Sequence, residues 1–298
     1  MKCLIALVAF NRPKHLELTL RNLYSALLNK PMHFHPHIIA FVDSPRSDND
    51  LHLNQSVLTL LKEFGVEVVL RRENMGLRNN ILEIFKYFKR SEYESLVVIE
   101  DDIVAHVDSM KYFFEMFNRY RDDSQVLQIS GFSPVRRSTL DVFRHSRLST
   151  WLWGTWQSKF PEVDSFVIDW SKFQVNHWIK QNLTSLSCMP DVQGILKSQS
   201  EKKINAWSLD LLIYMINLNM RTIYPTVTLA LNTGHDGSGV NCGKQNYFNW
   251  NLKRESASFK IQEINVLEIN ELVDLDLINK FKSYYDPNVL NRIMRAFT

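Results

Sequence analysis

The chain has 298 residues, of which 45% are hydrophobic and 22% are charged. This balance is typical of a protein that buries a substantial core, so it excludes disorder as the main state of the chain. The 35 Lys and Arg residues outnumber the 32 Asp and Glu residues by only three, and a net charge of +3 is too weak to indicate a nucleic-acid partner.

The beginning of the sequence and its cysteines favour the cytoplasm. The apolar stretch from Leu4 to Phe10 is far shorter than the roughly 20 residues that span a bilayer, and no charged leader precedes it. Cys3, Cys188 and Cys242 are odd in number and widely spaced, which predicts neither a disulfide framework nor a zinc cluster. We therefore expect no secretory signal and a reducing compartment.

The first 130 residues alternate between short apolar strands and amphipathic helices. Strands are predicted at residues 2–10, 37–42, 66–70 and 95–99. Apolar residues at helical spacing predict the intervening helices over residues 16–28, 57–64 and 77–88. Nearly continuous apolar strands separated by single helices predict a parallel sheet that is covered by helices on both faces.

After residue 130 this alternation stops. Helices are predicted at about residues 165–182 and 206–219, and a strand at residues 222–231. The chain ends in a short amphipathic stretch with four apolar residues on one side, namely Leu290, Ile293, Met294 and Phe297. Because the sequence contains no linker, internal repeat or low-complexity tract, we predict one continuous two-lobed domain over residues 1–298.

The strongest functional feature is the run Glu100-Asp101-Asp102 at the end of the fourth predicted strand. In open parallel sheets, ligands bind beyond the carboxyl ends of the strands. Three adjacent carboxylates repel one another unless a cation or a set of donors compensates them. A hard divalent ion, Mg²⁺ or Mn²⁺, that holds a diphosphate would do so. A solvated acidic turn is the structural alternative.

Two earlier strand ends open onto the same edge of the predicted sheet. Asp43 could accept a hydrogen bond from a base N–H, and Arg12 could pair with a phosphate or the base edge. Alternatively, Asp43 begins a turn and Arg12 lies exposed on the first turn of a helix. In the segment from Asn74 to Asn80, Gly76 permits close approach of a ligand, whereas helix capping explains Asn74 equally well.

Taken in this order, these segments resemble the nucleotide-sugar glycosyltransferases of the GT-A fold. The Glu-Asp-Asp run is similar to that of inverting N-acetylglucosaminyltransferases, and the chain is also similar to bacterial transferases of capsule and lipopolysaccharide synthesis. The resemblance covers about residues 3 to 245. It implies an α/β fold of the GT-A type, with a mostly parallel sheet, helices on both faces and an irregular acceptor-side half.

The resemblance also implies roles for individual residues. By position, Asp102 would bind Mn²⁺ (or Mg²⁺), Asp101 would contact the donor ribose or sugar, and Asp43 would hold uracil. Arg12 falls where the family has an arginine near the base, and Glu100 and Arg78 complete the predicted donor site. Residues 1–130 would be the nucleotide-binding half, 131–250 the acceptor and catalytic half, and 251–298 a C-terminal extension.

The second half carries three weaker similarities. The segment from Trp151 to Trp156 looks like the family's Gly-Trp segment beneath the donor, so Trp153 is a predicted donor contact, with core packing as the alternative. Trp207-Ser208-Leu209-Asp210 resembles the segment that holds the catalytic base, although the family carries adjacent acids there and only Asp210 remains here. An ordinary acid on an amphipathic helix is the alternative for Asp210.

A glycine-rich loop follows at residues 232–239. Its three glycines would allow backbone N–H groups to turn inward and close over a diphosphate. The resemblance implies that the loop orders over the donor, with Ser238 as a donor contact and His235 as a second metal ligand. A plain turn explains His235 equally well.

These observations predict a metal-dependent inverting glycosyltransferase. It would move a sugar, such as an N-acetylhexosamine, from a UDP-sugar to a hydroxyl of a surface-glycan or lipid-linked acceptor, with Asp210 as the one base that direct displacement needs. A nucleotidyltransferase is the alternative enzyme, but it would normally show a glycine-rich stretch where this chain has Asn11-Arg12-Pro13. A non-catalytic sugar-binding protein with a transferase fold is the alternative from another class.

The expected location is the cytoplasm, with a peripheral contact at the inner membrane face. The C-terminal amphipathic stretch carries Arg292 and Arg295 beside its apolar residues and could lie on anionic lipid. Packing of this stretch against the core is equally compatible with the sequence.

Overall fold

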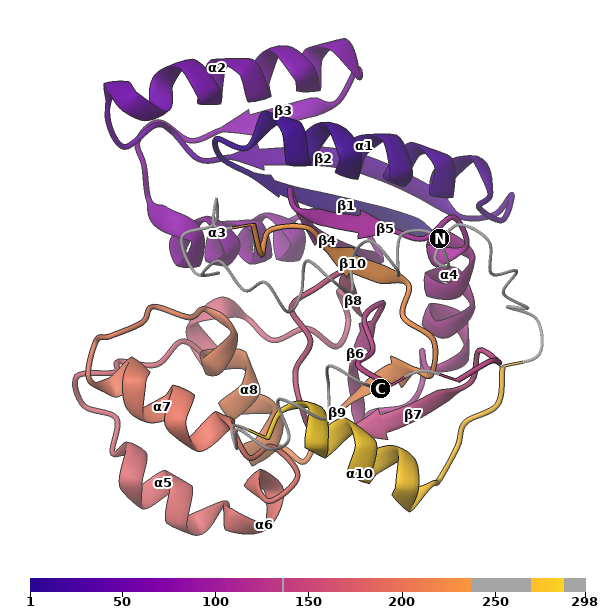
Figure 1. The fold of residues 1–298 in the computed structure, drawn as a ribbon, viewed down its shortest axis with the longest axis vertical. Coiled ribbons are helices and arrows are strands. Elements are labelled where there is room, and N and C mark those ends of the chain that lie inside the picture. The colour runs from indigo at the N-terminus through magenta and orange to yellow at the C-terminus, as the bar shows by residue number, and fades with distance from the viewer. Residues whose placement is uncertain (136, 237–268, 287–298) are drawn as a thin grey trace.

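The computed structural model describes residues 1–135, 137–236 and 269–286 (Figure 1). These residues form a mixed α/β structure around one large sheet with the strand order β3-β2-β1-β4-β8-β6-β9-β7. A small two-stranded sheet pairs β10 with β5. The glycine-rich loop beyond residue 236, with Ser238, and the C-terminal stretch from residue 287 lie outside the described residues.

The strands are β1 (Lys2–Ala9), β2 (His35–Val42), β3 (Glu67–Leu70), β4 (Ser95–Glu100), β5 (Ile103–Ala105), β6 (Val126–Ser130), β7 (Val142–His145), β8 (Trp153–Trp156), β9 (Arg221–Pro225) and β10 (Ala230–Asn232). The helices are α1 (Pro13–Leu28), α2 (Asp48–Glu63), α3 (Gly76–Arg90), α4 (Ser109–Arg119), α5 (Val175–Gln181), α6 (Leu183–Leu186), α7 (Val192–Ser200), α8 (Ser208–Asn217) and α10 (Leu275–Tyr284), with a single 3₁₀ turn η1 (Val163–Ser165).

The large sheet is mostly parallel, as the sequence predicts. Strands β3, β2, β1 and β4 run parallel to one another, and β6 runs parallel to β9. Of the strands described, β8 and β7 run antiparallel to their neighbours. The fold is consistent with a GT-A, Rossmann-like arrangement, and the carboxyl ends of β1, β2 and β4 meet at one edge of the sheet.

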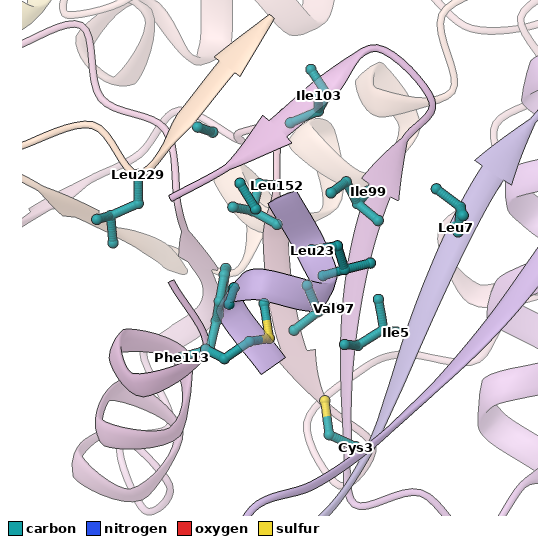
Figure 2. Close-up of a cluster of buried hydrophobic side chains, with 14 of the residues drawn as sticks. Cys3, Ile5, Leu7, Leu23, Val97, Ile99, Ile103, Phe113, Leu152 and Leu229 are labelled. Atoms are coloured by element: carbon teal, nitrogen blue, oxygen red, sulfur yellow. The ribbon is translucent and has the colours of Figure 1, made fainter. Parts of the chain in front are cut away.

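Alternating side chains of the strands supply two cores, one on each face of the sheet. Cys3, Ile5 and Leu7 of β1 point to the face covered by α1, α2 and α4. Figure 2 shows part of this core, where Leu23 of α1 and Phe113 of α4 approach the strands. Because successive residues of a strand point to opposite faces, a strand buried on both sides reads as one continuous apolar run.

The opposite face is covered by α3 and by the helices of the second half. Leu4, Ala6 and Val8 of β1 belong to this core, together with apolar side chains from α3, α5, α7 and α8. The second half therefore completes the covering of the sheet that the first half begins. A third, smaller cluster packs Leu277 and Phe281 of α10 against the far strands β7 and β9.

Two predictions for the second half are wrong in extent. The predicted strand at 222–231 is divided into β9 and β10, because Pro225 cannot donate a hydrogen bond to a neighbouring strand. Of the predicted helix at 165–182, only α5 forms beyond η1. The side chain of Asp169 accepts a hydrogen bond from the backbone N–H of Ser171, which forms a turn instead of a helix.

Within the described ranges, none of the helices combines the length and the apolar character needed to cross a membrane.

We expect His145 to make the folded state sensitive to acid. Burial, assisted by Arg147 and Arg221, lowers the pKa of His145 to about 3, whereas an unfolded histidine titrates near 6.5. The unfolded state therefore binds a proton first, and the free energy of unfolding should fall as the pH drops below about 6.5. Between pH 7.5 and 5 this residue should account for roughly 2 kcal/mol.

The measurement is urea unfolding of the wild type and His145→Asn at both pH values. Asparagine retains an acceptor for the Arg147 N–H, which donates to His145 Nδ1 at 3.0 Å, but it does not titrate. The variant should lose about 2 kcal/mol less than the wild type on acidification. An identical loss in both proteins would contradict the assignment.

Candidate active site at the carboxyl edge of the sheet

The candidate site forms where β1 and β4 end side by side. The two strands are parallel and in register, with Val8 opposite Glu100. The chain leaves β1 through Arg12 and leaves β4 through Asp101 and Asp102. The sheet therefore brings together two segments about ninety positions apart in sequence.

Arg12 bridges the two aspartates of the acidic run. Its Nη1 donates to Asp102 Oδ2 at 2.8 Å, and its Nη2 donates to Asp101 Oδ1. Burial lowers the pKa of Arg12, but the charges of Asp101 and Asp102 outweigh this effect and raise it above the usual range. The guanidinium therefore remains charged and offsets part of the negative charge of the acids. The sequence predicted that either a cation or a set of donors would compensate these carboxylates, and Arg12 supplies such a charge.

The chain after β10 closes over Asp102 from the other side. The N–H of Thr233 donates to the carbonyl of Asp102 at 2.8 Å, and its hydroxyl donates to the same oxygen at 2.9 Å. A Cβ atom on Gly234 would lie only 2.0 Å from Asp102 Oδ2, so this backbone packs directly against the carboxylate. His235 follows as a buried residue, with its ring 5.7 Å from the ring of Trp151.

This arrangement suits a divalent cation. Asp102 is only 4% exposed, and its Oδ1 has no hydrogen-bond partner among the residues that the structure describes. His235 is close enough for the charge of Asp102 to oppose the fall that burial causes in its pKa. The described ranges contain no group of three His, Cys, Asp or Glu side chains placed to hold a metal. Mg²⁺ and Mn²⁺ commonly take one or two carboxylates from the protein together with phosphate oxygens of a substrate.

The other two acids of the run are strongly affected by their surroundings. Burial raises the pKa of Asp101 to about 6, and Arg12 opposes that rise. Burial, followed by the charges of Asp102 and Asp101, also raises the pKa of Glu100. Perturbed carboxylates of this kind cluster at functional sites more often than elsewhere.

Asp43 lies at the same edge, but helix α3 occupies its carboxylate. Oδ1 accepts from the N–H groups of Ser44 and Met75, both at 3.0 Å. Oδ2 accepts from the N–H of Gly76 at 2.9 Å and from the amide of Asn74 at 3.1 Å. A carboxylate offers about four acceptor positions. In this conformation, Asp43 fixes the N-terminus of α3 to the end of β2, and a base N–H would have to replace one of these donors.

Asp210 and Arg78, which were predicted in separate roles, are ion-paired. The guanidinium of Arg78 in the first turn of α3 donates to Asp210 Oδ2, and the indole of Trp170 donates to Oδ1 at 2.7 Å. Asp210 is fully buried in the first turn of α8. Burial raises its pKa, although Arg78 and Trp170 oppose the rise. An acceptor hydroxyl can reach this carboxylate only if the cluster opens.

Trp153 lies in the core and offers no exposed ring face. It is fully buried on β8, and its ring stacks on Trp207 at 5.7 Å and meets the edge of Phe85. Core packing explains this residue as it stands in the structure. Trp151, two residues earlier, is the partly exposed indole near His235.

Two supporting residues on α1 were missed by the sequence analysis. His15 Nε2 lies 3.2 Å from Asp236 Oδ2, and the hydroxyl of Thr19 donates to the carbonyl of Asp101 at 2.8 Å. With Arg12 they occupy positions i, i+3 and i+7, which share one helix face. This spacing was a usable signal, because a helix that starts at the carboxyl edge of β1 directs that face to the end of β4.

Gly234→Ala should destabilise the protein, because Asp102 cannot move aside without breaking its bond to Arg12. We expect a loss of about 1–3 kcal/mol, typical of an overpacked buried site, measured as a lower thermal midpoint. Gly194→Ala is the matched control, since a Cβ there has no heavy atom within 4 Å. It lies in helix α7 and should be neutral or slightly stabilising. Equal effects of the two substitutions would contradict the close packing at Asp102.

No protein-family model matches the chain, and a search of curated proteins also found no match. Among solved structures, Staphylococcus aureus TarS 1-349 matches 98% of this chain and 71% of its own at 12% identity, with a TM-score of 0.44. A CMP:2-keto-3-deoxy-manno-octonic acid synthetase complexed with CTP matches 87% of this chain and 98% of its own at 14% identity, with a TM-score of 0.40.

The mannosyltransferase PcManGT from Pyrobaculum calidifontis, in complex with GDP-Man and Mn²⁺, matches 51% of this chain at 11% identity, with a TM-score of 0.36. This chain spans 44% of that protein's length. The similar structures thus include both a mannosyltransferase and a CMP:2-keto-3-deoxy-manno-octonic acid synthetase. With identities this low and TM-scores below 0.5, these similarities do not decide the reaction.

Proposed function

We propose that this protein is a metal-dependent glycosyltransferase that uses a nucleoside diphosphate sugar. The observation that carries the proposal is the acidic site at the carboxyl edge of the sheet, where Asp102 keeps one buried oxygen without a described partner. Ligands bind at this edge in open α/β sheets. His235 and the beginning of the glycine-rich segment lie nearby, as expected for a site that takes a metal and a diphosphate.

Asp102 and His235 would hold the cation, and substrate oxygens would supply its other ligands. When bound, the metal would neutralise charge on the leaving diphosphate. Arg12 adds a positive charge beside Asp101 and Asp102. Thr233 and Thr19 hold the backbone carbonyls of the two aspartates, so the carboxylates keep their positions before a substrate arrives.

The finer parts of the proposal rest on the order of motifs along the chain. We propose a UDP-sugar as the donor and a hydroxyl of a surface-glycan or lipid-linked molecule as the acceptor, with inversion at the anomeric carbon. We also propose that the protein works in the cytoplasm, at the inner membrane face. The order of strand ends and acids along the chain supports the choice of donor and acceptor, and the odd number and wide spacing of the cysteines support the choice of compartment.

The proposed reaction is tested by incubating the protein with UDP-, GDP- and CMP-linked sugars and Mn²⁺, and by measuring the released nucleotide. We expect release of UDP that stops in excess chelator. Asp102→Asn should lower the rate by about 100-fold or more, as expected when charge stabilisation at a reacting group is lost. Asp122→Asn, at an exposed acid between α4 and β6, is the matched control and should leave the rate unchanged.

Other outcomes identify the alternatives. Release of pyrophosphate from a nucleoside triphosphate would indicate a nucleotidyltransferase. Binding of nucleotide sugars without turnover on any acceptor would indicate a sugar-binding protein with a transferase fold. Full activity in excess chelator would remove the metal from the proposal.

Asp210 is proposed as the general base, freed from Arg78 and Trp170 when the acceptor binds. Its raised pKa suits a group that must accept a proton. Asp210→Asn should lower kcat by about 10²–10⁴, the usual size of a general-base contribution, while donor affinity stays the same. An equal loss of donor affinity, or a product with retained anomeric configuration by proton NMR, would contradict this role.

The control for Asp210→Asn separates catalysis from the loss of an ion pair. Asp191 forms a comparable pair with Arg147, at 2.7 and 2.9 Å, that ties α7 to the end of β7. Asp191→Asn should therefore lower stability without lowering kcat. If both variants lose stability and neither loses kcat, the Arg78–Asp210 pair is only structural.

A further inference from the structure

We propose that Arg12 is the resident counter-ion of the acidic site and that it competes with the divalent metal for Asp102. This inference rests on the proposed function, because it concerns the same metal site. It differs from the role implied by the sequence resemblance, which places Arg12 near the base of the donor. In the structure, both of its terminal nitrogens are used by Asp101 and Asp102.

Arg12 is positioned by the fold before any ligand binds. It is the residue immediately before α1, and its carbonyl accepts from the N–H of Leu16 at 3.0 Å. The preceding turn is fixed as well, since the amide of Asn54 donates to the carbonyl of Phe10 at 2.7 Å and Asn11 donates to Asp50 at 2.6 Å. The Arg12 side chain is only 17% exposed. The Arg12 guanidinium is therefore held in place by the fold, unlike an exposed charge on the surface.

The acids need such a counter-ion when no metal is bound. Asp101 and Asp102 are 2% and 4% exposed, and Glu100 adjoins them at the end of β4. Buried carboxylates this close are stable in their charged forms only beside a positive charge. Arg12 donates a hydrogen bond to each aspartate, which a single ammonium group could not do with the same geometry.

The same contact opposes binding of a metal. Arg12 uses Asp102 Oδ2, and a cation that takes both oxygens of Asp102 must displace it. A cation that takes Oδ1 alone must sit beside a fixed positive charge. In either case Arg12 weakens metal binding. A guanidinium displaced in this way would be free to pair with the phosphates of a donor, for which its shape is well suited.

The test measures Mn²⁺ binding by calorimetry and thermal unfolding with and without chelator, in the absence of a nucleotide. Arg12→Gln should unfold at a lower temperature than the wild type in chelator, because two buried carboxylates lose their partner. It should bind Mn²⁺ about tenfold more tightly or better, since a nearby positive charge is removed. Mn²⁺ should also raise its unfolding temperature more than that of the wild type.

Two further variants keep the test decisive. Arg21→Gln, at an exposed arginine of α1 that pairs with Glu17, is the matched control and should bind Mn²⁺ as the wild type does. If Arg12→Gln does not fold in chelator, Arg12→Lys replaces it. Lysine keeps the charge but cannot hold both carboxylates in the geometry of the guanidinium, so Asp102 Oδ2 is released more easily. This variant should therefore bind Mn²⁺ more tightly than the wild type, but by less than the roughly tenfold expected when the charge is removed.

The outcomes separate this inference from the proposed function. If the wild type binds Mn²⁺ and the Arg12 variant binds it equally or more weakly, the competition is refuted and the proposed function stands. If neither protein binds Mn²⁺ without a nucleotide, the competition is refuted, whereas the metal in the proposed function, whose shell is completed by substrate oxygens, is decided by the chelator experiment above. Tighter Mn²⁺ binding by the variant, without sugar transfer by the wild type, supports the inference and refutes the transferase.

Discussion

The bridge from Arg12 to Asp101 and Asp102 is the interaction on which the candidate site depends. Parallel pairing of β1 with β4 forces the ends of these strands together, so the acids leave β4 beside Arg12, the residue immediately before α1. Buried carboxylates require a compensating charge, and the fold supplies it from the neighbouring strand end. The topology of the sheet itself thus places a positive charge beside the acids of this edge.

The second half of the chain acts on this edge in two ways. The segment after β10 packs its backbone against Asp102, because Gly234 has no side chain there. Helix α8 supplies Asp210, which pairs with Arg78 of α3 and so joins the helices covering one face of the sheet. Both contacts tie segments from the two halves of the chain together.

Several residues that suggest chemistry in the sequence have structural duties in the fold. Asp43 accepts four hydrogen bonds, three of them from the start of α3, and Trp153 stacks on Trp207 inside the core. These contacts are compatible with a second role, but a ligand that binds Asp43 or Trp153 has to replace some of them. A carboxylate at a helix N-terminus and an indole between a sheet and its helices are stabilised there whether or not a ligand binds.

The sequence by itself determined the alternation of strands and helices up to residue 100, since continuous apolar strands and helical spacing depend on local pattern. It also determined that Asp102, Asp43 and Arg12 would share one edge, because parallel strands end on the same side. The division of residues 222–231 depended on Pro225, which has no N–H to donate, and the turn at Asp169 depended on a side-chain hydrogen bond that competes with a helix. Only the tertiary structure decided which residues meet. It pairs Arg12 with the acids and Arg78 with Asp210, and it packs Gly234 against Asp102. The two ion pairs join residues 90 and 132 positions apart. Local pattern can place each of these residues at a strand end or on a helix face, but it does not say which charged partner the residue meets.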